Sequence, residues 1–82
     1  LNKNIQYPKI AKENGIQGKV FVQFVVWKDG TIRDVKVVKG VHKTLDNEAL
    51  RVVKEMPKWK PGKQDGKAVN ARFTMPIKFR IS

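Results

Sequence analysis

The chain has 82 residues and no cysteine, and its 18 lysines and arginines outnumber its 7 aspartates and glutamates, for a net charge of +11. A chain of this length forms one small domain with a thin core, without disulfides or thiolate metal sites. No run approaches the roughly 18 consecutive apolar residues that cross a bilayer. The start does not resemble a signal peptide, and because it is Leu1, we expect a fragment or a processed form.

A short helix is expected first, because Pro8 suits the first turn of a helix and PKIAKENG leads to a left-handed stop at Gly15. The stretch KVFVQFVVW after Gly18 then alternates as a strand does. Its apolar face carries Val20, Val22, Phe24 and Val26, and its other face is also partly apolar.

A hairpin turn is expected at Asp29-Gly30, because both residues tolerate the positive φ that such turns require. The return strand, TIRDVKVVKG, shifts its alternation by one residue near Arg33-Asp34. This shift predicts a β-bulge.

A second, amphipathic helix is expected from Thr44 to Met56, with Thr44 or Asp46 as its cap and Pro57 after its end. Its apolar stripe consists of Leu45, Ala49, Val52, Val53 and Met56. The following PKWKPGKQDGK has the composition of a loop, under which Trp59 is interpreted as a packed anchor.

The last strand is expected from Val69 to Ile81, where apolar and polar residues alternate strictly. Its seven inward positions are Val69, Ala71, Phe73, Met75, Ile77, Phe79 and Ile81. Pro76 stands in its middle, although proline cannot donate to a sheet ladder. The order α-β-β-α-β predicts an α+β fold, a two-layer sandwich in which helices cover one face of a three-stranded antiparallel sheet.

Chemistry for catalysis is not apparent in this sequence. The single histidine, His42, lies in a connection, and the carboxylates are spread singly beside turns and in the first turns of a helix. The glycines have no phosphate-cradling spacing. We therefore expect no enzyme activity, no metal site and no cofactor.

An ordered series of motifs, from Tyr7 to Ile81, resembles the TonB carboxy-terminal domain family. The motifs are YP, GxxGKVFVQFVV, DGTI, VKVV, LDNEALRVV, MPKWKPG and PIKF. The resemblance implies a domain over residues 7–82, preceded by a linker over residues 1–6. It also implies a periplasmic location, with an absent amino-terminal part that anchors the chain to the inner membrane and to a proton-driven motor.

By the same resemblance, the domain binds the TonB box of outer-membrane transporters and passes mechanical energy to them for substrate uptake. The box, a short extended peptide, would add as a strand beside the last strand of the sheet. If Pro76 turns its missing donor outward, neighbouring amides at even positions also point outward and can pair with the guest. The expected partner-binding residues on this strand are Asn70, Ala71, Arg72, Phe73, Thr74 and Met75. Alternatively, Pro76 only blunts an idle edge.

The segment ahead of the Tyr-Pro pair also contacts the transporter in the family. Here it supplies Asn4 and Gln6 as candidates, with Asn4 where the best-known members have glutamine, and it could instead be linker.

Three alternatives remain open from the sequence. The basic surplus could bind an anionic partner, such as nucleic acid, a phospholipid surface, an acidic cell-wall polymer or an acidic protein segment, although no nucleic-acid signature is present and a solvated surface is simpler. The domain could be the partner-binding tail of a membrane signalling protein. An unpaired strand edge could also exchange between copies and give a homodimer.

Overall fold

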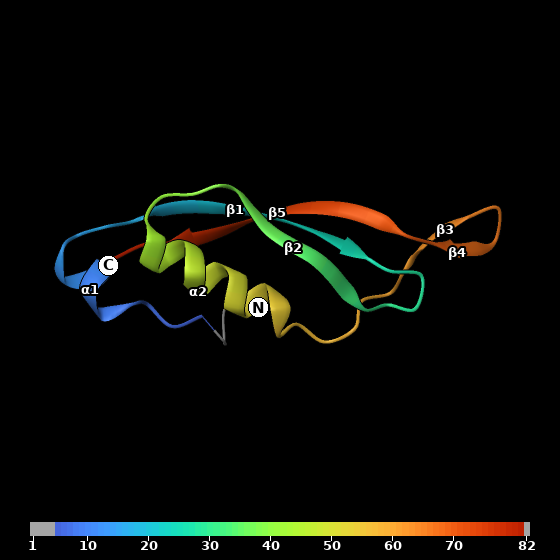
Figure 1. The fold of residues 1–82 in the computed structure, drawn as a ribbon, viewed down its shortest axis with the longest axis horizontal. Coiled ribbons are helices and arrows are strands. Elements are labelled where there is room, and N and C mark those ends of the chain that lie inside the picture. Colours follow the sequence, from blue (N-terminus) through green and yellow to red (C-terminus); the bar gives the residue numbers. More distant parts are fainter. Residues whose placement is uncertain (1–4, 82) are drawn as a thin grey trace.

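The structure, a computed structural model, describes residues 5–81 and has two layers. Three antiparallel strands form the sheet, with β1 (Gly18–Val26) between β2 (Ile32–Lys39) and β5 (Ala71–Phe79). The helices α1 (Lys9–Glu13) and α2 (Lys43–Lys54) pack against one face of this sheet (Figure 1). The expected α+β sandwich is therefore confirmed. No helix over residues 5–81 is long and apolar enough to cross a membrane.

The core lies between α2 and the central strand. The four inward residues of β1, which are Val20, Val22, Phe24 and Val26, are fully buried, as the alternation predicted. Leu45, Ala49 and Val53 of α2 meet them from the helical layer. Burial of one large apolar side chain contributes about 1.5–3 kcal/mol, so this layer contact carries much of the stability.

The hairpin between β1 and β2 differs in detail from the expected turn. The N–H of Gly30 donates to the carbonyl of Trp27 at 2.8 Å, and Gly30 has a φ of 87°. Asp29 keeps a negative φ and instead accepts hydrogen bonds from Thr31 through its carboxylate. A three-residue loop with one left-handed glycine explains this geometry.

Irregular pairing in β2 confirms the predicted bulge. Gln23 is opposite Lys36 and Val25 is opposite Arg33, so two steps along β1 face three steps along β2. Asp34, within this stretch of β2, has a φ of 54°. A second shift lies opposite Phe21 and Val22. Both shifts leave extra residues outside the ladder.

The second helix begins one residue before the predicted start and has a different cap. His42 is the N-cap, and its Nδ1 accepts from the N–H of Thr44 at 3.3 Å. The prediction of Thr44 or Asp46 as the cap was therefore wrong. Asp46 instead accepts a hydrogen bond from the N–H of Val41, at 3.0 Å, and so fastens the connection ahead of the helix.

The loop expected after α2 contains a second small sheet. β3 (Gly62–Gln64) pairs with β4 (Lys67–Val69) in a hairpin that projects from one end of the molecule (Figure 1). Asp65 and Gly66 both have positive φ at its turn, the geometry that favours a two-residue hairpin loop. Only the first part of the stretch, residues 57–61, is the expected loop.

The last strand is shorter than predicted, because the chain leaves the ladder at Asn70 between β4 and β5. Ile77 and Phe79 are buried as expected, whereas Phe73 is 40% exposed. The helical layer covers only one end of β5. The prediction of seven inward positions on this strand was therefore an overestimate.

Candidate functional site

The outer edge of β5 is the candidate site. All nine residues of β5 are in unbroken register with β1, from Ala71 opposite Val26 to Phe79 opposite Gly18. In residues 5–81, no strand pairs with the other side of β5. Its polar backbone groups on that side are therefore available to an added strand.

Hydrogen bonds at the end of β1 show which of its residues face β2 and which face β5. The N–H of Trp27 donates to Thr31, at 2.8 Å, on the β2 side of the hairpin. Because N–H direction alternates along a strand, odd residues of β1 face β2 and even residues face β5. The N–H of Lys28 accordingly donates toward the β5 side, to Asn70 Oδ1 at 2.8 Å.

The even residues of β5 consequently present their backbone outward. Its odd residues are paired with even residues of β1, so they exchange the ladder bonds. The N–H of Ile81, which follows in the same phase, indeed donates toward β1, to Gln17 Oε1 at 3.0 Å. Arg72, Thr74 and Lys78 therefore carry outward N–H groups, and Pro76 occupies an outward position where no ladder bond is lost.

The other edge of the sheet is a poorer template. The two register shifts in β2, at Asp34 and near Val38, interrupt its row of outward groups. Bulges of this kind are a common means of blunting an edge. The regular outer edge is thus the one on β5.

On the helix side of this edge, aromatic rings form a platform that is partly exposed. Phe73 stacks against Phe24 with ring centroids 5.9 Å apart and lies 5.4 Å from Trp59. The Trp59 ring also meets Phe24 edge-on at 5.2 Å, which confirms Trp59 as a packed anchor. Half-buried Met75 continues the platform along β5. An apolar side chain of a guest strand would find contact here.

At the start of β5, Asn70 and Ala71 have structural partners. The Asn70 side chain accepts the hydrogen bond from Lys28 and so ties the first hairpin to the last strand. Half-buried Ala71 packs close to Gly62. A Cβ added at Gly62 would lie 3.5 Å from the Cβ of Ala71. Arg72 and Thr74, by contrast, are exposed.

The segment ahead of α1 lies beside the opposite end of β5. Ile5 and Tyr7 line an open hollow together with residues 76–80. The Tyr7 ring meets Phe79 edge-on at 5.6 Å, and its hydroxyl donates to the carbonyl of Ile16. The sequence did not single out Ile5 or Tyr7 as site residues, although the YP motif marked the place. Asn4, the other expected contact here, lies outside the described residues.

Gln6 is placed by a charged pair on α2. Its N–H donates to Glu48 Oε2 at 2.7 Å, and Arg51 forms two further bonds to the same carboxylate, at 2.8 and 2.7 Å. These bonds hold the pKa of Glu48 below its usual value, against the opposing effect of partial burial. The exposed Gln6 side chain lies away from the β5 amides that were expected to bind with it.

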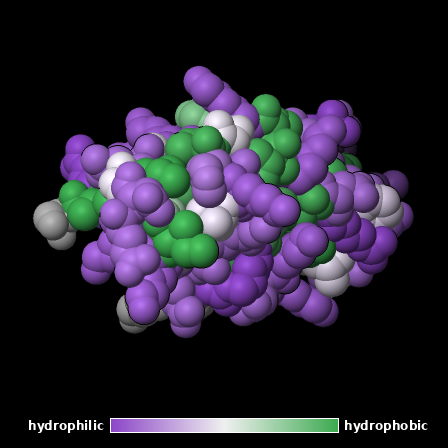
Figure 2. All heavy atoms as spheres, turned by 60° about the vertical axis from the view of Figure 1, so that its left-hand side comes forward, coloured by the Kyte–Doolittle hydropathy of each residue, from purple (hydrophilic) through white to green (hydrophobic). Residues whose placement is uncertain are grey.

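Hydrophilic side chains cover most of the face seen in Figure 2, and the hydrophobic ones form small separate patches. Over residues 5–81, no three His, Cys, Asp or Glu side chains are grouped to hold a metal ion. The arrangement is suited to binding an extended chain through backbone hydrogen bonds.

Comparisons with known proteins all give the same family. A family model described as the carboxy-terminal part of the Gram-negative bacterial TonB protein matches residues 3–81. The chain is 34% identical over 77 residues to Protein TonB of Pseudomonas aeruginosa, which covers 92% of this chain and 22% of that protein. It is 32% identical over 79 residues to Protein TonB of Vibrio cholerae, covering 93% of this chain and 31% of that protein. The chain thus spans less than a third of the length of these relatives.

The fold is also similar to solved structures. The solution structure of the Helicobacter pylori TonB carboxy-terminal domain matches with a TM-score of 0.72 and 30% identity, over 96% of this chain and 83% of that one. That of the Pseudomonas aeruginosa domain matches with a TM-score of 0.68 and 30% identity, over 93% of this chain and 77% of that one.

Proposed function

The chain belongs to the TonB carboxy-terminal domain family, as its sequence motifs predicted, and from this premise we propose that it captures the TonB box of outer-membrane transporters along the outer edge of β5. The box would add as a fourth strand of the sheet. Relatives of this chain are TonB proteins, which are not enzymes, and binding with force transmission is the corresponding function.

The unpaired, regular edge of β5 is the observation that carries the proposal. Each outward residue other than Pro76 can exchange two backbone hydrogen bonds with a guest strand. A net contribution of about 0.5–1.5 kcal/mol for each bond gives useful affinity from a short segment. Arg72 and Thr74 supply the outward amides of the main pairing segment, and Pro76 limits how far the guest can continue.

Side chains beside the edge would add further contacts to this backbone pairing. On the helix side, the guest would lay apolar side chains on the exposed part of Phe73 and in the hollow beside Ile5 and Tyr7. Asn4 and Gln6 are proposed as further contacts for the part of the transporter that leaves the strand.

The setting of this function follows from the family. The domain would work in the periplasm, joined by residues 1–6 and an upstream segment to the inner membrane and its proton-driven motor. Force applied through that connection would reach the transporter through the added strand. In the absence of a guest, the same edge could pair with a second copy of the domain.

A titration of the isotope-labelled domain with a TonB-box peptide tests the proposal. We expect chemical-shift changes over residues 70–75 and slower exchange for the outward amides of Arg72 and Thr74, with the edge of β2 unaffected. A peptide of the same composition in scrambled order is the control. Binding that leaves residues 70–75 unchanged would reject the proposal.

A further inference from the structure

The sheet face turned away from the helices carries a dense array of positive charge. On β1 this open face presents Lys19, Phe21, Gln23 and Val25, which alternate with the buried residues, and Trp27 follows the strand in the same phase. The residues directly opposite them on the neighbouring strands share the face. The open face therefore bears six exposed cations, Lys19, Arg33, Lys36, Lys39, Arg72 and Lys78.

Like charges face one another across the strands. Lys19 is directly opposite Lys78, a pairing that costs stability in a sheet. Arg33 and Arg72 lie on the two sides of Val25 in another row. These pairings concentrate positive charge on the open face.

Carboxylates leave most of the array without ion pairs. No Asp or Glu occupies a register position on the open face among the paired residues of β1, β2 and β5. Asp29, at the hairpin turn, pairs with Arg33 at 3.4 Å. Glu48 and Glu55 pair with Arg51 on α2, in the other layer. Within residues 5–81, five of the six cations have no ion-pair partner: Lys19, Lys36, Lys39, Arg72 and Lys78.

Aromatic rings lie among these cations. The Arg33 guanidinium lies over the Trp27 ring, 4.4 Å from its centroid, and the Lys39 ammonium is 5.8 Å from the centroid of Phe21. Both rings are half-buried beneath the long basic side chains. Trp and basic side chains with apolar stems are typical of surfaces that meet the headgroup region of a membrane.

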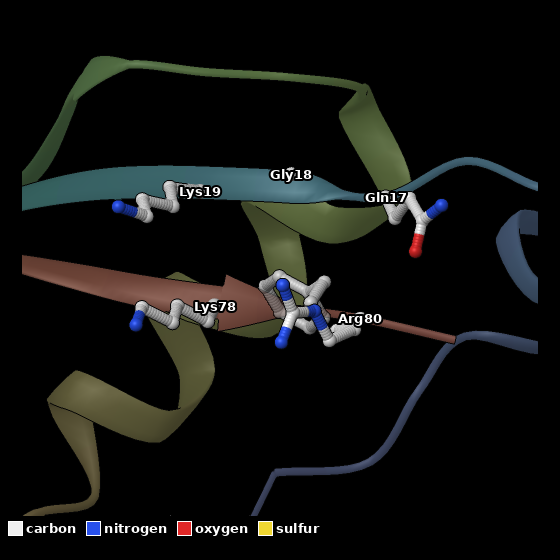
Figure 3. A pocket seen from close by; sticks show the side chains of 6 residues that line it. Gln17, Gly18, Lys19, Lys78 and Arg80 are labelled. Atoms are coloured by element: carbon white, nitrogen blue, oxygen red, sulfur yellow. The ribbon is translucent and has the colours of Figure 1, made fainter. Parts of the chain in front are cut away.

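One end of the open face is hollowed and ringed by positive charge. Lys19 and Lys78 extend side by side from β1 and β5, with Arg80 close to them (Figure 3). Gln17, Gly18 and Phe79 complete the lining. Lysine and arginine side chains that line one hollow suit a phosphate group.

We propose that this open face docks on a membrane containing anionic phospholipids, with a headgroup phosphate in the hollow between Lys19, Lys78 and Arg80. The cations occupy all three strands, so a flat anionic surface meets the whole array, whereas a linear polymer would follow only one row. Docking leaves the outer edge of β5 open. The inference thus goes beyond the proposed peptide binding and does not depend on it.

Vesicle binding tests this inference. The domain is mixed with vesicles of phosphatidylcholine alone or with phosphatidylglycerol added, and bound protein is measured by co-sedimentation at low and high salt. We expect binding only to the anionic vesicles, weakening as salt rises. Lys19→Gln/Lys78→Gln should lower the partition coefficient about 25-fold, since each cation near an anionic surface contributes about five-fold.

The matched control is Lys9→Gln/Lys43→Gln, which removes the same charge from exposed first-turn positions of the two helices. It should keep its partition coefficient within about two-fold, because these lysines lie in the helical layer, away from the docked surface. Equal binding to both kinds of vesicle, or equal loss in both variants, would overturn the inference. Tight binding to soluble polyglutamate with no vesicle binding would also overturn it and would assign the face to an acidic peptide.

Discussion

Replacing Thr74 by proline removes one outward N–H from the edge of β5 and leaves the ladder to β1 intact. The outward phase of Thr74 is the same as that of Pro76, two residues later, which the strand already accommodates. The preceding Phe73 is extended, the conformation that a following proline favours. Loss of one backbone bond to the guest, at about 1 kcal/mol, should weaken the peptide about five-fold, and the proline ring should weaken it further by obstructing the approach.

Titration calorimetry with a TonB-box peptide measures this effect. Thr74→Ala is the matched control, because it removes the side chain and keeps the N–H, and its Kd should stay close to that of the parent. Thermal unfolding of both variants checks that the sheet persists. If folded Thr74→Pro bound the peptide as tightly as the parent, the guest would not use this edge.

Three further changes test other parts of the structure. Pro76→Ala restores an outward N–H, so it should tighten peptide binding by up to about five-fold in titration and increase self-association in sedimentation equilibrium. Phe24→Ala empties a fully buried position under the aromatic platform and should cost about 3–5 kcal/mol of unfolding free energy in urea denaturation. The lowered pKa of Glu48 means that its bonds to Arg51 stabilise the fold above the unfolded pKa and are lost as pH falls through the folded one. Urea unfolding from pH 6 down to pH 3 should therefore show a steeper loss for the parent than for Glu48→Gln, and equal slopes would contradict this role.

Local periodicity predicted most of the sandwich. The alternation along β1 identified its buried face because every second side chain must enter the same thin core. The bulge near Arg33-Asp34 was visible because a single extra residue inverts that alternation. The stripe from Leu45 to Val53 identified α2 for the same reason at a helical period.

Features set by contacts between distant segments were not predictable in this way. The exposure of Phe73 depends on where the helical layer ends, which the strand's own alternation does not record. The hairpin of β3 and β4 has three-residue strands without an apolar face, so only Asp65-Gly66 signalled it. His42 was overlooked as a cap because histidine is not among the preferred capping residues.

The candidate site was predictable only in part. Pro76 correctly suggested an outward phase for the even residues of β5, since proline inside a ladder would lose a bond. Whether β5 or β2 offers the regular edge depends on strand order and on the bulges, which are properties of the assembled sheet. The hydrogen bond from Lys28 to Asn70 joins residues far apart in sequence, so no local pattern could predict it.

Contacts between the hydrogens of a bound peptide and those of β5 are the decisive test of strand addition at this edge. Isotope-filtered NMR of the labelled domain with an unlabelled TonB-box peptide should give cross-strand contacts from the peptide backbone to Arg72 and Thr74. Contacts from the peptide to the backbone of β2, with none to β5, would show that the guest does not add beside β5.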